Sequence, residues 1–380
     1  MTTRIKVLQL HPDYNVKSCD VSDLAEQIVK ALPSERYEIT SAYLCGEPTP
    51  GQPSSIAEHI HYFRLAHSDL TGLRLKALWK LYRYCSLHKF DVVICNRFKS
   101  VSPMLQLNKL LGIPVCIGIS HVMDEYHRFY RRLQVRYLAD VRWHFVGVSD
   151  AVRDWMIAYN SGFTLQNTHA IPNAIDIVKS ETIQLSRHDA RAALKLPQDR
   201  IIIGAIGQLL ERKGHQFLIS ALARISTQFP HAHVGIIGRG PEEQKLRRQI
   251  SELGLEDKVH LLGFRENALQ YVKAFDIWTM PSLKEGLPLA LMEGMSGRLP
   301  VIASNIPEMC DLILGAGGIA VPTKNVDALK KAISSYLALD STALAAKGEE
   351  VFHYLTTQHS IESYRNNYLT LIEHALEKNT

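Results

Sequence analysis

Two carboxylates, Glu285 and Glu293, stand eight positions apart in the segment KEGLPLALMEG (284–294), with Pro288 between them. On one continuous helix, eight residues would separate the two Cα atoms by roughly 12 Å. A pair of acid and base carboxylates, as in glycoside hydrolysis, needs its carboxyl groups within about 5.5 to 9.5 Å of each other. The spacing therefore favours two carboxylates that contact different parts of one ligand.

Pro288 predicts a helix N-terminus between the two carboxylates. Proline is tolerated in the first helical turn and not in a helix interior, so we expect the helix to begin near Leu287 or Pro288. Glu285 then lies on the preceding loop, and Glu293 about one and a half turns into the helix. The free N–H groups and the positive dipole end favour an anion there. The alternative is two solvated glutamates on a surface helix.

A second group of candidates follows the apolar run 200–206, in the segment GQLLERKG (207–214). Ligands of open α/β sheets bind at the carboxyl ends of strands, which is where this segment would lie. Arg212 and Lys213 would meet the positive end of the next helix at a cost of about 0.3 to 1 kcal/mol each. A bound diphosphate would turn that repulsion into charge-assisted hydrogen bonds. The alternative is a solvated basic loop.

Other motifs carry weaker signals. The segment GRGP (238–241) lacks the full GxGxxG pattern, so a dinucleotide is not favoured and a tight turn explains the glycines as well. His121 ends the apolar run 114–121, although a lone histidine is commonly structural. The sequence has no CxxC, no Cys/His ligand spacing and no DxD motif, so neither a metal nor another cofactor is expected.

Length and composition indicate a two-domain globular protein. The chain has 380 residues, of which 46% are hydrophobic and 21% charged. Its apolar runs fall short of the ~20 residues that a membrane span needs. The first residues read as a strand rather than a signal peptide, and the six cysteines are scattered. A reducing cytoplasm is the expected location.

The net charge of +5 arises entirely from the first half of the chain. Residues 1–180 hold 21 Lys and Arg against 16 Asp and Glu, whereas the second half is balanced. Segments 59–90 and 126–145 mix arginines with aromatic residues, a combination that suits an anionic membrane surface or a phosphorylated partner. Nucleic acid would fit the same charge. Two amphipathic helices with solvated basic faces are the structural alternative.

Strand and helix signals alternate along the chain, which predicts βαβ units and doubly wound parallel sheets. The first series has strands at 4–10, 37–44, 91–96, 114–121 and 143–149. Between its first two strands, Val21, Leu24, Ile28 and Leu32 recur at helical spacing, and Ser22 or Asp23 is available as the helix cap. The second series has strands at 200–210, 231–240, 259–264, 276–282 and 299–304, with helices at 214–226 and 241–255. We therefore predict domains at 1–175 and 176–358, and a C-terminal helix at 359–380 that packs back on the first domain.

The ordered motifs resemble those of a known enzyme family. EGLPLALMEG is similar to the E-x7-E signature of the retaining GT-B glycosyltransferases of family 4, and GQLLERKG to the phosphate loop of that family. Further blocks in the same order resemble the family: GVSDAV (147–152), IPNAID (171–176), GRGP, VHLLGF (259–264) and LPVIAS (299–304). The resemblance implies two Rossmann-like domains that face a central cleft.

The resemblance also implies a role for each candidate residue. Arg212 and Lys213, after Gly207, would hold the diphosphate of a UDP- or GDP-linked sugar, and Glu293 would bind the ribose hydroxyls. Glu285, with the backbone of Gly286 and Leu287, would hold the donor sugar. The backbone near Arg265 would contact the base, and His121 would reach the sugar from the first domain.

The implied reaction is metal-independent transfer of a hexose-type sugar to a glycan or glycolipid, with retention of anomeric configuration. The EGLPLAL form of the motif resembles that of relatives that act on lipopolysaccharide core, so an acceptor of this type is expected. Peripheral contact with the inner membrane is also expected. Nucleic acid is not expected as a partner. Three departures from the family concern Gln208, where arginine is common, the glycine-free loop 11–23, and Pro288. A sugar-nucleotide epimerase of the same fold and a non-catalytic nucleotide-sugar-binding protein are the alternatives.

Overall fold

The computed structural model describes residues 4–17, 21 and 23–379. The chain divides into two compact units, Met1–Asn173 with Ile361–Thr380, and Ala174–Ser360. The predicted boundaries at 175 and 359 each differ by two residues from these. The reason is a parallel bridge between Ile175 and Ser360, which adds both segment ends to the second unit.

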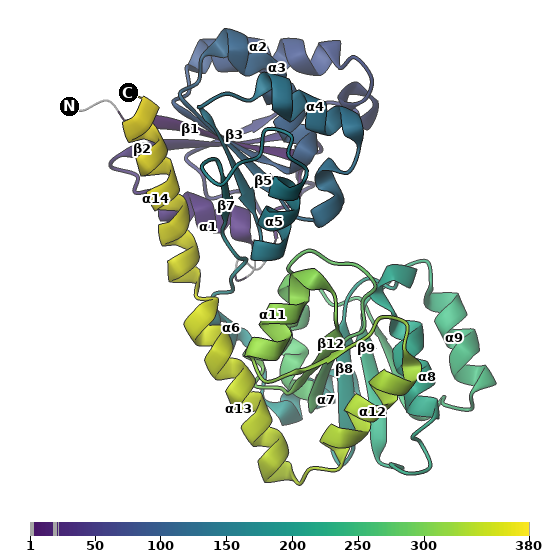
Figure 1. Cartoon of the computed structure of the whole chain (residues 1–380). Coiled ribbons are helices and arrows are strands. Elements are labelled where there is room, and N and C mark those ends of the chain that lie inside the picture. Colours follow the sequence, from purple (N-terminus) through teal and green to yellow (C-terminus); the bar gives the residue numbers. More distant parts are fainter. Residues whose placement is uncertain (1–3, 18–20, 22, 380) are drawn as a thin grey trace. The chain divides into compact units, whose positions relative to one another are not determined.

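Unit 1 is built on seven parallel strands in the order β3-β2-β1-β4-β5-β6-β7 (Figure 1). The strands are β1 Ile5–Asp13, β2 Tyr37–Cys45, β3 His59–Tyr62, β4 Val92–Asn96, β5 Val115–Ser120, β6 Trp143–Gly147 and β7 Thr168–Ala170. The helices of this unit are α1 Leu24–Ala31, η2 His67–Leu70, α2 Leu75–His88, α3 Arg97–Leu111, η3 Met123–Tyr126, α4 Phe129–Leu138, α5 Asp150–Ala158 and α14 Ile361–Asn379. Strands such as β4 are continuous apolar runs because helices cover both faces of the sheet.

Unit 2 repeats the plan with six parallel strands in the order β10-β9-β8-β11-β12-β13. The strands are β8 Ile201–Ile206, β9 Ala232–Ile237, β10 Val259–Gly263, β11 Ile277–Met280, β12 Val301–Ser304 and β13 Ile319–Val321. The helices are α6 Ile177–Ile183, α7 Arg187–Leu194, η4 Glu211–Lys213, α8 His215–Ala223, α9 Glu243–Glu252, η5 Ala268–Ala274, α10 Leu289–Ser296, α11 Pro307–Gly315, α12 Val326–Leu337 and α13 Ser341–Gln358. The predicted α/β fold class with two Rossmann-like parallel sheets is confirmed.

Both sheets have the strand order of a dinucleotide-type doubly wound fold. In each unit the first strand lies between the second and the fourth, so the winding direction reverses between β1 and β4 and between β8 and β11. A crevice at the carboxyl ends of the strands forms at such a reversal and is the usual ligand site. The loops after these four strands are therefore the positions that matter for function.

Three short strands escaped the sequence prediction. β3 lies inside the basic and aromatic segment 59–90, and β7 and β13 have three residues each. All three are at or next to a sheet edge, where few apolar residues are needed. Short edge strands therefore leave little periodic signal in the sequence.

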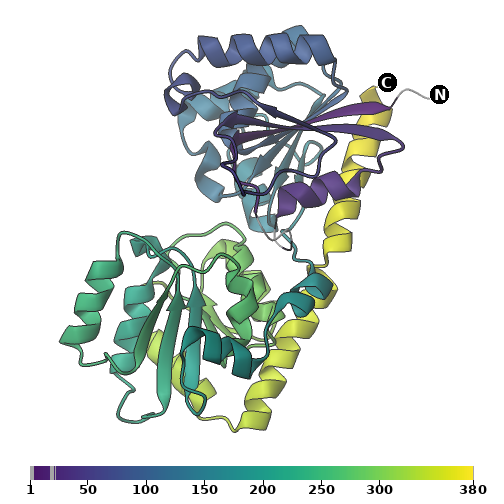
Figure 2. The same cartoon turned by 180° about the vertical axis from the view of Figure 1, so that it is seen from behind.

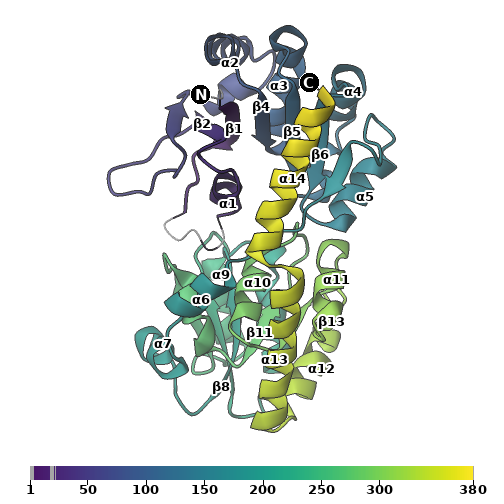
Figure 3. The same cartoon turned by 90° about the vertical axis from the view of Figure 1, so that its left-hand side faces the viewer.

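Helix α14 packs on unit 1, beside α1 (Figures 2 and 3). The Tyr364 hydroxyl donates to the carbonyl of Leu24 over 3.3 Å, and Arg365 Nε donates to Gln27 Oε1 over 3.0 Å. Asp23 caps α1 by accepting from the Glu26 N–H, whereas Ser22 lies outside the described residues. Among the residues that the structure describes, no helix is long and apolar enough to cross a bilayer.

Candidate donor-binding site

The loops after β8 and β9 are in direct backbone contact with each other. Gly207 N–H donates to the Ile237 carbonyl over 3.0 Å. A Cβ at Gly238 would lie 1.8 Å from the Gly207 carbonyl oxygen, and one at Gly240 would lie 2.3 Å from that of Leu209. Only glycine fits at both positions. Close packing thus explains the GRGP segment, and it holds the loop that starts at Gly207.

The same loop is tied to the loop that follows β11. Leu283 N–H donates to the Arg212 carbonyl over 2.7 Å. Gly214, with φ +71°, is the C-cap of η4 and the N-cap of α8, and a Cβ there would lie 2.0 Å from the Pro281 carbonyl oxygen. These contacts bring the two loops of the winding reversal together. Arg212 and Lys213 lie in η4, directly before α8, rather than in the helix itself.

Lys213 and Glu285, predicted from separate motifs, form an ion pair. The Nζ of Lys213 lies 2.5 Å from Glu285 Oε1, with the two side chains only 14% and 8% exposed. Arg212 is half-exposed, and its guanidinium lies 3.9 Å from Glu285 Oε2. The structure therefore places two cations and one carboxylate at the carboxyl ends of β8 and β11.

Helix α10 begins slightly later than predicted. Its first residue is Leu289, because Pro288 takes an extended ψ of 124° and acts as the N-cap. Glu293 is the fifth residue of this helix, so it lies just over one turn in. Leu287 is buried and Gly286 is half-buried. Among the described residues the half-buried Glu293 carboxylate has no ion-pair or hydrogen-bond partner, so it is available to a ligand.

Arg265 follows β10, two strands away from β8 in the sheet. Its guanidinium donates to the Phe264 carbonyl over 3.1 Å. Gly263 has φ +72° and accepts from the Gly238 N–H over 3.0 Å, which ties this loop to the one after β9. The exposed Phe264 ring lies 4.6 Å from the guanidinium of Arg239. An exposed aromatic ring beside a guanidinium offers a position where a planar ring such as a nucleobase can stack.

His121 lies in unit 1, directly after β5, where its N–H donates to Glu125 Oε2 over 3.1 Å. Burial first, and the positive charge of Arg97 second, lower the pKa of His121 to about 4. The imidazole is therefore neutral at pH 7. Glu125 also accepts from the Phe98 N–H over 2.6 Å and from Ser120 Oγ over 2.9 Å, while burial raises its pKa.

Two histidines escaped the sequence analysis. β1 extends to Asp13 rather than ending at residue 10, so His11 belongs to the strand; its ring stacks on Tyr43 at 5.0 Å. Its Nε2 is buried without a hydrogen bond, and burial, followed by the charge of His121, lowers its pKa to about 3. In unit 2, His215 begins α8 with both ring nitrogens buried and unbonded. The feature of the sequence that could have pointed to them is their position, since His11 lies near the end of a strand and His215 at the start of a helix.

Comparisons with known proteins identify the family of this chain. Residues 21–179 match the sequence profile described as "Glycosyltransferase Family 4", and residues 186–349 match "Glycosyl transferases group 1". The two matches together cover most of the chain, one in each unit. The chain therefore belongs to the group 1 glycosyltransferases with the GT-B fold, which confirms the family that the motifs resemble.

Among curated relatives, the lipopolysaccharide core biosynthesis mannosyltransferase LpcC of Rhizobium leguminosarum is 24% identical over 77% of this chain and 81% of its own. The core glycosyltransferase LpsE of Rhizobium meliloti is 30% identical over 48% of this chain and 52% of its own. The uncharacterized glycosyltransferase MJ1059 of Methanocaldococcus jannaschii is 34% identical over 36% of this chain. The matched region thus spans about a third of MJ1059 and half of LpsE.

Solved structures show the same fold. Anabaena HepE in complex with UDP superposes with a TM-score of 0.79 over 97% of this chain and all of that chain, at 18% identity. Sucrose-phosphate synthase from Thermosynechococcus elongatus gives 0.78 over 99% of this chain and all of that chain, at 19% identity. At 18% and 19% sequence identity, these similarities show a shared fold and nothing more.

Proposed function

We propose that this protein transfers a hexose-type sugar from a nucleotide-diphosphate sugar to a hydroxyl of a glycan or glycolipid, with retention of anomeric configuration. The observation that carries the proposal is the Lys213–Glu285 pair at the β8/β11 reversal, with Arg212 beside it and the free Glu293 carboxylate on α10. A sugar diphosphate offers an anion for the cations, hydroxyls for the carboxylates and a base for the Arg265 loop. The HepE complexes with UDP and UDP-glucose support a uridine or related donor.

In the proposed reaction the acceptor hydroxyl attacks the anomeric carbon from the face that the diphosphate leaves. The bond from that carbon to the phosphate oxygen breaks, and this oxygen takes the hydroxyl proton as the new glycosidic bond forms. Lys213 and Arg212 would neutralise the charge that develops on the leaving group, so no metal is assigned to this step. Glu285, oriented by Lys213, would hold hydroxyls of the donor sugar. The neutral His121 of unit 1 would donate or accept one hydrogen bond to a substrate hydroxyl.

Titration calorimetry with UDP, GDP and ADP tests the donor site. We expect one nucleotide to bind clearly better than the others, and Glu293→Gln to weaken that binding by about 10- to 100-fold, because charged hydrogen bonds to the ribose contribute about 1.5 to 3 kcal/mol. Glu252→Gln, on the exposed end of α9, is the matched control and should bind as the native chain does. Equal nucleotide affinity of the native protein and Glu293→Gln would exclude the proposed role of Glu293 in binding the ribose.

One assay of sugar transfer tests both the anomeric configuration of the product and the requirement for a metal ion. We expect NMR of the freshly formed product to show the anomeric configuration of the donor, and we expect EDTA to leave the rate within about twofold, since the side-chain cations act on the diphosphate. Inverted product would contradict the front-face step. Loss of turnover in EDTA that Mg²⁺ restores would show that a metal shares the neutralisation.

An acceptor carried by lipid fits the surface of unit 1, and the lipopolysaccharide core relatives suggest this class of acceptor. Helices α2 and α4 expose apolar side chains between arginines: Leu75, Trp79, Leu87, Phe129 and Tyr137 are 56% to 77% exposed. The guanidinium of Arg83 lies 4.7 Å from the Trp79 ring, and that of Arg136 lies 5.9 Å from Tyr137. Such a surface suits the headgroup region of an anionic bilayer, where the protein would meet its acceptor.

Sedimentation with lipid vesicles tests the membrane proposal. We expect binding to phosphatidylglycerol-containing vesicles, weak binding to pure phosphatidylcholine, and a decrease with salt. The double variant Leu75→Ala/Trp79→Ala should weaken binding by about tenfold or more, because it removes apolar surface that would be buried in lipid. Leu314→Ala, an equally exposed leucine of unit 2, is the control. Equal affinity for charged and neutral vesicles would exclude the electrostatic part of the proposal.

A further inference from the structure

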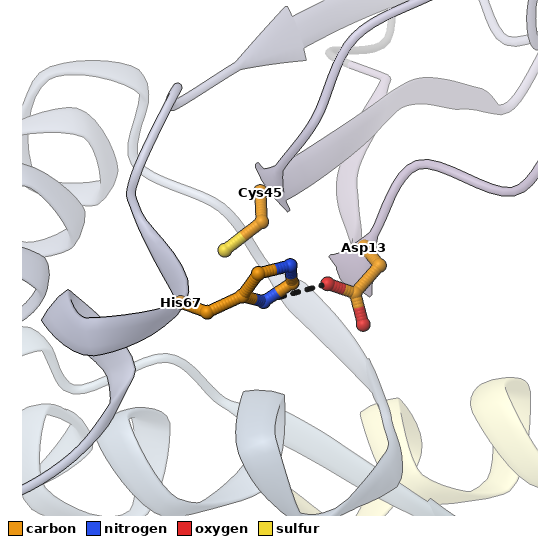
Figure 4. Close-up of side chains that lie close together, drawn as sticks. All are labelled: Asp13, Cys45 and His67. Carbon is orange, nitrogen blue, oxygen red and sulfur yellow. Dashed lines mark ion pairs between the residues drawn. The ribbon is translucent and has the colours of Figure 1, made fainter.

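A cluster of three potential metal ligands lies in unit 1, apart from the residues proposed for sugar transfer. Asp13 is the last residue of β1 and Cys45 the last of β2, and the two are direct partners in the parallel register. His67 is the first residue of η2. Figure 4 shows the His67 ring beside both the Cys45 sulfur and the Asp13 carboxylate.

Backbone hydrogen bonds hold His67 at this edge of the sheet. Leu65 N–H donates to the Leu44 carbonyl over 2.9 Å, so the chain after β3 runs along the end of β2. Asp69 Oδ2 then accepts from the Ala66 N–H over 3.0 Å, which fixes the start of η2. Asp13 and Cys45 therefore lie at the carboxyl ends of adjacent strands, where ligands bind in this fold, and His67 joins them from the segment after β3.

One of the potential ligand atoms, Asp13 Oδ1, has no hydrogen bond. His67 Nδ1 lies 3.4 Å from Asp13 Oδ1, and that oxygen is buried without a hydrogen bond. One ligand atom from each residue lies within 4.8 Å of the other two. Around a tetrahedral Zn²⁺ the corresponding separations are roughly 3.3 to 3.8 Å. A closure of about 1 Å, achievable by the exposed His67 on a one-turn helix, would bring the three atoms to one ion.

We propose that Asp13, Cys45 and His67 bind one divalent transition-metal ion of the zinc type. A thiolate, an imidazole nitrogen and a carboxylate are the ligands that Zn²⁺ takes, whereas Mg²⁺ and Ca²⁺ prefer oxygen ligands alone. The thiolate and the carboxylate together balance the two charges of the ion. Three protein ligands leave the fourth position to water. Within residues 4–17, 21 and 23–379, no other group of three His, Cys, Asp or Glu side chains has this geometry.

Cobalt is the probe for the thiolate ligand, because Co²⁺ replaces Zn²⁺ in such sites and gives a sulfur-to-cobalt charge-transfer band. We expect the full-length, metal-stripped protein to bind one Co²⁺ with this band, Zn²⁺ to displace it, and a large excess of Mg²⁺ to leave it unchanged. Cys45→Ser should abolish the band. His67→Gln, at an exposed position that should not disturb folding, should weaken Zn²⁺ binding by about tenfold or more, as should Asp13→Asn.

Two control variants separate this site from adventitious binding by other thiols and imidazoles. Cys310→Ser changes a half-buried cysteine of unit 2, and His127→Gln changes an exposed histidine of unit 1. Both should keep the cobalt band and the native affinity for Zn²⁺. A band that survives Cys45→Ser, or Zn²⁺ affinity that His67→Gln leaves unchanged while circular dichroism shows a folded protein, would overturn the proposal.

Discussion

Lys213→Met is expected to lower kcat/KM for sugar transfer by about 10²- to 10³-fold, the usual effect of removing one group that stabilises a developing negative charge. Methionine keeps most of the lysine volume but has no charge for the diphosphate. The same change leaves the Glu285 carboxylate, which is 8% exposed, without its 2.5 Å partner. We therefore also expect the free energy of unfolding of unit 2 to fall by about 1 to 3 kcal/mol.

A double variant separates these two effects. Glu285→Gln added to Lys213→Met removes the buried charge that has lost its nearest partner, so stability in urea should recover while activity stays low. Lys245→Ala, which breaks the 3.0 Å ion pair between Lys245 of α9 and Glu242 at the N-cap of that helix, is the control and should change neither property by much. Recovery of activity together with stability in the double variant would mean that Lys213 acts only by holding the loop.

Gly214→Ala is expected to destabilise unit 2 by about 2 to 4 kcal/mol. The backbone has φ +71°, which costs a residue with a Cβ about 1 to 2 kcal/mol. The added Cβ would also lie 2.0 Å from the Pro281 carbonyl oxygen, so the loops after β8 and β11 must separate. Because Lys213 and Glu285 lie on these two loops, donor binding should weaken as well. Chemical unfolding and nucleotide titration measure the two effects.

Gly254→Ala is the matched control, since Gly254 has φ +63° and no atom within 4 Å of the added Cβ. It should show the backbone cost alone, about 1 to 2 kcal/mol, with nucleotide binding unchanged. Equal destabilisation by the two variants would show that the loops can yield at little cost. The contact between Gly214 and Pro281 would then not be what positions the two loops.

The sequence alone determined the two α/β domains and the spacing of the strands, and it predicted candidate residues for a donor site. Buried parallel strands such as β4 and β8 are short apolar runs separated by helical patterns, and that signal is local. Glu285, Lys213 and His121 are candidates because each follows a strand, which in this fold is where ligands bind. What remained imprecise was also local: Pro288 caps α10 rather than beginning it, and β1 continues to Asp13.

Only the tertiary structure decided which of these side chains meet. Lys213 and Glu285 are 72 positions apart, and their pairing follows from the placement of β8 next to β11, which no local pattern encodes. The convergence of Asp13, Cys45 and His67 likewise depends on the β3-β2-β1 order at the sheet edge. Strand order is set by the burial of whole faces and by the handedness of the crossovers, so it appears only when the chain is folded.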